Sequence, residues 1–227
     1  MATRPVFEVY ERQPFVYKRN IDFTFFSGFS PEQKKRSARS LHDSYLKVFP
    51  DKKILEISRA SEEKLGEALS AFNLMIVQKN GISYSVECAF QAGKCFEKGG
   101  PYTDLMSKSS IEAKKDPRLR SSGEVIGFRF KNLDFPTEPK TYFYDWLYVN
   151  ALNKHPEYHE QLLQFDAFTD IMFTPPRMIN CQAEAVAVFV SLKKSGLLEK
   201  ALESKESFLD TVFGLPESTQ IKFDDLP

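Results

Sequence analysis

The sequence predicts an α+β protein: a mainly helical single domain with a small β-sheet and a hairpin. Capped and periodic segments indicate helices along most of the chain. Short aromatic and β-branched runs indicate a few strands, and the Asn80-Gly81 pair between two apolar runs indicates a hairpin. With 227 residues, of which 42% are hydrophobic, the chain can bury one substantial core.

The composition excludes several classes of protein. Lysine plus arginine and aspartate plus glutamate are both 31, so contact with nucleic acid requires a local patch or pocket. No apolar run reaches membrane-spanning length and the N-terminus lacks a signal-peptide pattern, so we expect a cytoplasmic protein without a membrane partner. Cys88, Cys95 and Cys181 lack metal-ligand spacing and fit reduced thiols, and no metal or organic cofactor is indicated.

Residues 1–50 are expected to form an N-terminal extension packed on the core. Residues 6–10, 15–17 and 21–26 are predicted strands or extended arms. Ser30-Pro31 then starts a helix, because serine is a good cap and proline suits the first helical position. One face of this helix is basic. It is either solvated or contacts a phosphate backbone, and it comprises Lys34, Lys35, Arg36 and Arg39.

The rest of the chain alternates between helices and short strands. Strands are expected at 54–58, 74–78, 82–84 and 125–130, and a short helix from Ser61 weakened by Gly66. Ser109 opens a capping box, and further helices are expected at about 139–152, 157–164 and 181–193. Residues 216–227 are polar and acidic and are expected to form a flexible tail. Pro156 between His155 and His159 argues against a shared metal site.

One predicted helix combines three site-like residues. It begins after Ser85 and meets no proline before Phe96, which places Glu87, Gln91 and Lys94 on one face. A carboxylate there can move protons, an amide can orient a substrate and an amine can attack or hold an anion. The alternative is an exposed charged face without chemistry.

These residues also carry a resemblance to a known family. Residues 69–74, a hairpin and then Ser85-x-Glu87-x-x-x-Gln91-x-x-Lys94 resemble the signature of NADAR domains. Other segments are similar to the NADAR antitoxins paired with DNA-modifying DarT1 toxins: Gly99-Gly100-Pro101-Tyr102-Thr103-Asp104-Leu105, Glu112-Ala113-Lys114-Lys115-Asp116-Pro117-Arg118, Phe143-Tyr144-Asp145-Trp146-Leu147, Ala167-Phe168-Thr169-Asp170 and Ile179-Asn180-Cys181-Gln182-Ala183.

The resemblance implies that residues 51–215 form a NADAR catalytic domain with the NADAR fold. It implies an N-glycosidase that removes ADP-ribose from guanine bases of DNA and so reverses the modification made by a DarT1-type toxin. Its partners would be ADP-ribosylated DNA and, at least functionally, that toxin. Carried over to this sequence, Glu87 is the catalytic carboxylate, and Lys94 is a lysine that attacks the anomeric carbon to form a Schiff base.

Further substrate-binding residues are expected from position. Asn73 and Gln91 would hydrogen-bond the substrate. Phe72 or Tyr84 would stack on a ring, the alternative being a place in the core. Backbone N–H groups at Gly99 and Gly100 would hold a diphosphate beside Tyr102 and Thr103, and Asp170 would orient a sugar hydroxyl.

Two alternative functions stay open. Relatives that cleave phosphoribosylamino-pyrimidine intermediates of riboflavin synthesis carry a late Asp-x-x-Trp-Gly motif, whereas this chain has Asn180-Cys181-Gln182 there and a single tryptophan, Trp146. That difference weakens the hypothesis that the protein cleaves these small metabolites. A non-catalytic antitoxin that neutralises the toxin by binding it is the other alternative, suggested by the aromatic and basic N-terminal extension.

Overall fold

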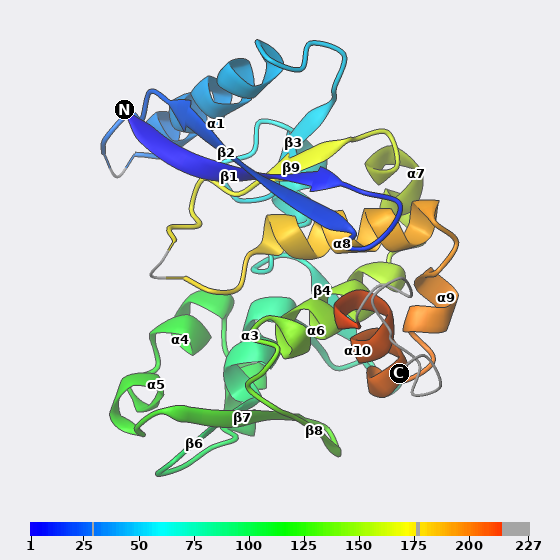
Figure 1. The fold of residues 1–227 in the computed structure, drawn as a ribbon. Coiled ribbons are helices and arrows are strands. Elements are labelled where there is room, and N and C mark those ends of the chain that lie inside the picture. The colour runs from blue at the N-terminus through cyan, green and yellow to red at the C-terminus, as the bar shows by residue number, and fades with distance from the viewer. Residues whose placement is uncertain (29, 176–177, 215–227) are drawn as a thin grey trace, which may run out of the picture.

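A four-stranded sheet lies at one end of the molecule, in the order β2-β1-β9-β3 (Figure 1). In the computed structural model, which describes residues 1–28, 30–175 and 178–214, β1 (Ala2–Val9) is antiparallel to β2 (Val16–Phe23) and to β9 (Ala167–Thr169). The strand β3 (Ile54–Glu56) is parallel to β9. The first strand of the chain is therefore an interior strand of this sheet.

The two strands expected at 15–17 and 21–26 form the single strand β2. The residues between the two predicted strands, Lys18-Arg19-Asn20, also pair with β1. Arg19 Nε lies 2.7 Å from Glu8 Oε1 on the neighbouring strand, and its guanidinium lies over the Tyr17 ring. Cross-strand ion pairing and stacking explain how charged residues are accommodated inside a strand.

Helices cover both faces of this sheet. The helix α1 (Pro31–Leu46) contacts β2 on one side and begins as predicted, with Ser30 Oγ accepting from the Gln33 backbone N–H. The helix α8 (Gln182–Lys194) contacts β1 and β9 on the other side and also packs on α6 (Tyr142–Asn153). Apolar side chains fill both interfaces, and Leu41 and Tyr45 of α1 belong to one cluster with Val6 and Phe23 of the sheet.

The predicted hairpin is formed by β4 (Met75–Val77) and β5 (Ser83–Ser85), and Gly81 in its turn has a φ of +82°. The hairpin leads directly into α3 (Val86–Ala92), where Ser85 Oγ accepts a 3.1 Å hydrogen bond from the Cys88 backbone N–H. This cap fixes the first turn of the helix that carries Glu87.

A second sheet supports the other end of α3. Its order is β6-β7-β8, formed by β6 (Lys94–Phe96), β7 (Val125–Phe130) and β8 (Leu133–Phe135). Phe90 of α3 stacks with Phe128 and Phe143 at centroid separations of 5.8 and 6.0 Å. These rings join the second sheet, α3 and α6 into one core.

Shorter elements complete the fold. The capping box predicted at Ser109 is present at the start of α4, where Ser109 and Glu112 satisfy each other's backbone N–H groups. The predicted helix at 157–164 is a 3₁₀ turn followed by a short α-helix. The remaining elements are α2 (Lys64–Ala68), η1 (Thr103–Ser107), α4 (Ser110–Lys115), α5 (Arg118–Ser121), η2 (Pro156–Tyr158), α7 (His159–Leu162), α9 (Leu198–Ala201) and α10 (Lys205–Phe213).

The fold is α+β and mainly helical, as the sequence predicts. One prediction about α3 is wrong. The helix ends at Ala92 with Gly93 as its C-cap, and Lys94 is the first residue of β6, where it pairs with Phe128. The tail predicted at 216–227 lies outside the described residues. Among the described residues, no helix has the length and apolar character needed to cross a bilayer.

Candidate active site

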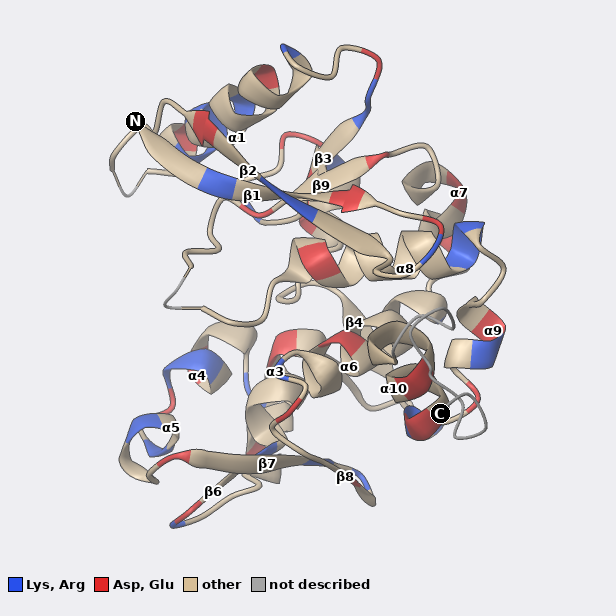
Figure 2. Cartoon of the chain, viewed as in Figure 1, with Lys and Arg blue, Asp and Glu red and all other residues tan. Residues whose placement is uncertain are grey.

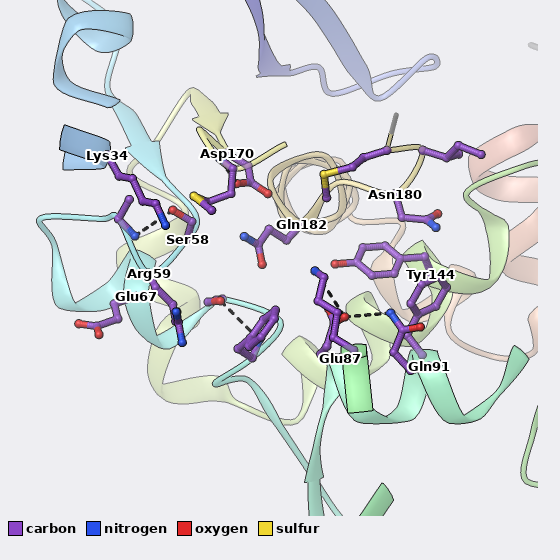
Figure 3. A pocket seen from close by; sticks show the side chains of 18 of the residues that line it. Lys34, Ser58, Arg59, Glu67, Glu87, Gln91, Tyr144, Asp170, Asn180 and Gln182 are labelled. Atoms are coloured by element: carbon purple, nitrogen blue, oxygen red, sulfur yellow. Dashed lines mark hydrogen bonds and ion pairs between the residues drawn. The ribbon is translucent and has the colours of Figure 1, made fainter. Parts of the chain in front are cut away.

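A cavity of about 730 Å³ lies between the first sheet and α3, within the usual size range of small-molecule sites. One side carries residues from α1, α2 and the segment after β3, and the other carries residues from α3, β6, α4 and α6 (Figure 3). A third side is lined by Asp170 and Met172 and, further along the chain, by residues between 178 and 182. The polar lining of the whole cavity consists of Lys34, Ser58, Arg59, Glu67, Ser70, Glu87, Gln91, Lys94, Lys114, Tyr144, Asp170, Asn180 and Gln182.

Glu87 lies in the first turn of α3 and is only 5% exposed. Its Oε1 atom accepts a 2.9 Å hydrogen bond from Gln91 Nε2, one helical turn later, and lies 3.5 Å from Lys114 Nζ of α4. Oε2 makes no hydrogen bond to the described residues. One carboxyl oxygen is therefore fixed by neighbours and the other is available to a bound molecule.

Lys94 reaches the same cavity from β6 rather than from α3. Its Nζ atom lies 4.7 Å from the centroid of the Phe90 ring. Burial lowers the pKa of Lys94, the negative charge of Glu87 opposes this shift, and the positive charge of Lys114 adds to it. A lysine with a lowered pKa is more often a free amine at neutral pH and is a better nucleophile.

Phe72 also lines the cavity, and two basic side chains lie over its ring. Lys114 Nζ lies 5.0 Å from its centroid, and the guanidinium carbon of Arg59 lies 5.5 Å from it. The ring is partly exposed rather than buried in the core. It can therefore offer an aromatic surface inside a cationic environment.

Asp170 follows β9 and is buried in the cavity wall. Its Oδ1 atom accepts a 2.9 Å hydrogen bond from the Met172 backbone N–H, and the Gln182 side chain also donates to it. Burial, together with the negative charge of Glu56, raises the pKa of Asp170 to about 8. At neutral pH the group is therefore a carboxylic acid, which can donate a hydrogen bond as well as accept one.

Glu56 is held behind this wall by three donors. Its Oε1 accepts from Ser58 Oγ (2.6 Å) and from the Ile171 backbone N–H (2.8 Å), and its Oε2 accepts from Thr169 Oγ1 (2.7 Å). Burial raises the pKa of Glu56 to about 7, and these hydrogen bonds oppose the shift. The network fixes the end of β9, and with it Asp170.

The network extends to α1. His42 Nε2 lies 2.7 Å from Thr169 Oγ1, and because that hydroxyl donates to Glu56, His42 must donate to it. Burial lowers the pKa of His42 to about 4, so the ring is neutral. The N-terminal helix is therefore hydrogen-bonded to the wall that carries Asp170.

Two buried acceptors that line the cavity have no partner among the described residues. They are Gln91 Oε1 and Asn180 Oδ1. Tyr144 lies between them, and Figure 3 shows its hydroxyl pointing into the cavity. A buried oxygen without a donor costs free energy unless a ligand or water supplies one, so these atoms mark places where a ligand N–H or O–H group fits.

Several residues predicted to bind substrate lie outside the cavity lining. Asn73 is exposed, and its Nδ2 atom donates to the backbone oxygen of Glu67 at 2.8 Å. Tyr84 belongs to the core, where its ring meets Phe130 edge to face and its hydroxyl accepts from Gln78 Nε2. Both face away because strand side chains alternate and the turn before β4 points Asn73 outward.

The glycine loop is also separate from the cavity. Gly99 and Gly100 close a turn against β6, with the Phe96 N–H donating 2.8 Å to the Gly99 carbonyl oxygen. Tyr102 shares a 2.5 Å hydrogen bond with Ser122 Oγ and lies under the Arg118 guanidinium, and Thr103 is exposed. The loop thus folds on itself and on α5, outside the lining of this cavity, and its diphosphate-binding role stays a prediction.

The two histidines singled out in the sequence make local contacts. His155 Nε2 lies 2.7 Å from the Met75 carbonyl oxygen, and His159 Nε2 lies 3.0 Å from that of Leu152. In the part of the chain that the structure describes, no cluster of three or more His, Cys, Asp or Glu side chains is arranged to hold a metal ion.

Of the predicted site residues, the cavity brings together Glu87, Lys94, Gln91, Phe72 and Asp170. Sequence reasoning assigned no role to Arg59, Lys114, Tyr144, Asn180 and Gln182, which also line it. All of these except Arg59 lie in the segments that carry the family resemblance, so those segments were the available signal.

Comparisons with known proteins bear on the whole chain. A search of curated proteins found no match. A family profile described as DarT1-associated NADAR antitoxin matches residues 2–221, which includes the N-terminal strands, α1 and every element that lines the cavity. The chain belongs to the family of DarT1-associated NADAR antitoxins.

Proposed function

We propose that this antitoxin is an N-glycosidase that hydrolyses the bond between ADP-ribose and guanine in DNA, and so reverses the modification made by a DarT1-type toxin. The observation that carries the proposal is that Glu87 and Lys94 line one cavity, with one oxygen of Glu87 held by Gln91 and Lys114. Family membership supports the antitoxin role.

The pair suits attack on a glycosidic carbon. Lys94 passes a proton to Glu87, and its neutral amine attacks the anomeric carbon of the ribose. The bond from that carbon to the guanine nitrogen breaks, and Glu87 gives the proton to the departing guanine, which stays in the DNA. Protonation of the leaving nitrogen by a positioned acid contributes about 10²–10⁴ in rate.

The lysine adduct then has to be released. Its ribose ring opens to a protonated imine, with the ring oxygen taking a proton from the amine. Glu87, now ionised, removes a proton from a water molecule that adds to the imine carbon. The resulting carbinolamine collapses to free ADP-ribose and the free amine of Lys94. The net reaction consumes one water molecule.

The residues opposite supply substrate contacts in this proposal. Asp170, as a neutral acid, hydrogen-bonds a ribose hydroxyl, and Phe72 offers its ring to a base. The unpartnered Gln91 and Asn180 oxygens accept from N–H or O–H groups of the substrate. Six residues predicted to bind substrate lie outside the cavity lining and have no role in the proposed reaction: Asn73, Tyr84, Gly99, Gly100, Tyr102 and Thr103.

The first test is release of ADP-ribose from an oligonucleotide that carries one ADP-ribosylated guanine. We expect release by the wild type and a loss of at least about 10²-fold in kcat for Glu87→Gln. Glu63→Gln is the matched control, because Glu63 is exposed and its side chain does not cap α2. Equal rates for wild type and Glu87→Gln would reject Glu87 as the acid.

The second test traps the imine. Borohydride added during turnover reduces it to a stable secondary amine, which adds the mass of the reduced ADP-ribose to the protein. We expect the adduct with wild type and with Lys98→Ala, a nearby exposed lysine, but not with Lys94→Ala. Trapping on Lys94→Ala would assign the nucleophile elsewhere, whereas hydrolysis without any adduct would favour direct attack by water.

A further inference from the structure

The basic face predicted on the N-terminal helix is divided by the structure. Arg39 forms an ion pair with Glu62, and Arg36 lies over the Phe26 ring and contacts Gln33. Lys35 lines a separate small depression together with His42 and Glu63. Among these four basic residues only Lys34 lines the main cavity.

Arg59 lines the same side of the cavity from the segment after β3 (Figure 3). It is exposed, and Lys34 is half-buried. Among the described residues, no carboxylate lies within ion-pairing distance of either side chain, in contrast to Arg39 and Arg118. Arg59 contacts the Phe72 ring, but neither cation is neutralised by a carboxylate of the described residues, so both can meet an anion at this side.

These cations lie across the cavity from the proposed chemistry. Figure 3 shows Lys34, Ser58 and Arg59 on one side and Glu87, Gln91 and Tyr144 on the other. Lys114, the cation nearest to Glu87, is already engaged with that carboxylate at 3.5 Å. Basic residues also gather on α4 and α5 (Figure 2), but the whole chain carries equal numbers of basic and acidic residues, so attraction for a polyanion must arise locally.

We propose that Lys34 and Arg59 form a phosphate-binding pair that holds the DNA backbone beside the modified guanine. The inference rests on the proposed function and names the part of the substrate that the N-terminal helix recognises. The arrangement lets the modified base and its sugar enter the cavity while a neighbouring phosphate stays at the rim. A phosphate contact of this kind positions a strand without reading its sequence.

One acidic residue allows a test in which DNA affinity should rise rather than fall. Glu67 of α2 also lines the cavity, and Figure 3 shows it on the same side as Arg59. Its carboxylate is exposed and repels a phosphate held there. Removing that charge should strengthen DNA binding, whereas removing Lys34 or Arg59 should weaken it.

The first experiment measures binding without chemistry. Fluorescence anisotropy with an unmodified single-stranded oligonucleotide, over a series of salt concentrations, gives the affinity and its salt dependence. We expect Lys34→Ala and Arg59→Ala each to weaken binding by about two- to fivefold. Each should reduce the slope of log K against log salt by about 0.7, and Glu67→Gln should tighten binding.

Lys35→Ala is the matched control, since it removes the same charge from the next residue of the same helix but outside the cavity. An unchanged slope for this variant supports the proposal. A slope reduced as much as in Lys34→Ala would overturn it, because a general basic face would then bind the strand. Unchanged slopes for Lys34→Ala and Arg59→Ala would overturn it as well.

The second experiment decides which phosphate is held. The ratio of kcat/KM on the ADP-ribosylated oligonucleotide to kcat/KM on ADP-ribosylated guanosine should fall about two- to fivefold in Lys34→Ala and Arg59→Ala. An equal loss on both substrates would assign the cations to the diphosphate of ADP-ribose and reject the backbone contact. If the wild type cleaves neither substrate, the proposed function fails, while the anisotropy result still decides whether this pair binds DNA.

Discussion

Gln91 Nε2 donates a 2.9 Å hydrogen bond to Glu87 Oε1 across one turn of α3. This contact orients the carboxyl group, so we expect Gln91→Leu, which cannot donate, to lower kcat for ADP-ribose release by about tenfold. Gln91 acts here as a positioning residue as well as a substrate contact. The discriminating measurement is the pH profile of kcat, which should shift in Gln91→Leu. Gln91→Asn should restore the wild-type profile only if its shorter amide still reaches Glu87.

Asp170 should tolerate an amide better than a small apolar side chain. Its pKa of about 8 makes it a neutral acid at pH 7, and asparagine keeps both a donor and an acceptor. We therefore expect Asp170→Asn to retain most activity and Asp170→Ala to lose about tenfold or more. In the wild type activity should fall as pH rises through about 8. A similar alkaline fall in Asp170→Asn would show that another group causes it.

Stability should decrease as pH rises from about 6.5 to about 8. Burial raises the folded-state pKa of Asp170 to about 8 and that of Glu56 to about 7, so in this window the folded protein binds more protons than the unfolded chain. The contribution of Asp170 and Glu56 to the free energy of unfolding is full below their pKa values in the unfolded chain. It is lost as pH rises through their pKa values in the folded protein. His42, whose pKa is lowered to about 4, has the opposite dependence, but only below about 6.5.

Thermal unfolding at constant ionic strength measures this effect. Tm of the wild type should drop between pH 6.5 and 8, and the drop should be smaller in Asp170→Asn. A Tm that is flat in both proteins over this range would contradict the assigned protonation of the cavity wall.

Gly66→Ala should destabilise the fold although alanine is the better helix former. A Cβ at this position in α2 would overlap the Glu56 carbonyl oxygen and the Ser61 side chain. Helix propensity favours alanine by only about 1 kcal/mol, whereas displacing a backbone oxygen next to a buried carboxyl network costs more. We expect a net loss of about 1–3 kcal/mol by denaturant unfolding. Gly127→Ala is the control, because the added Cβ would meet only the Phe135 carbonyl oxygen, at 3.3 Å, a much smaller overlap.

The antitoxin should protect cells through catalysis. In cells that produce a DarT1-type toxin, we expect wild type to restore growth and the double variant Glu87→Gln with Lys94→Ala to fail at the same protein level. Both side chains line the cavity, so the folded surface seen by a toxin should change little. Rescue by the double variant would favour neutralisation through binding of the toxin.

The sequence predicts the elements whose signals are local. Ser30-Pro31, the Ser109 capping box and the Asn80-Gly81 turn each fix a structure within a few residues, and all three are present. The position of Glu87 and Gln91 on one helical face is equally local, because the Ser85 cap and the spacing of four residues determine it.

What the sequence missed depends on long-range pairing. The Arg129 backbone N–H donates 2.7 Å to the Gly93 carbonyl oxygen, and β6 pairs with β7, so the helix stops before Lys94. No sequence pattern near residue 94 indicates that this segment pairs with a strand more than thirty residues away. The far wall of the cavity was missed for the same reason, since Asn180 and Gln182 reach it only when α8 packs on the first sheet.

The interior position of β1 also affects how the protein is made. Phe7 pairs with Phe168 and Glu8 with Ala167, so β1 must wait until β9 has been synthesised before its second edge is covered. The wall that carries Asp170 is attached to that same strand, so the cavity cannot be completed on a nascent chain that stops short of residue 170. An antitoxin built this way gains its pocket only after β9 and Asp170 have been synthesised, so shorter nascent chains cannot give protection that depends on the cavity.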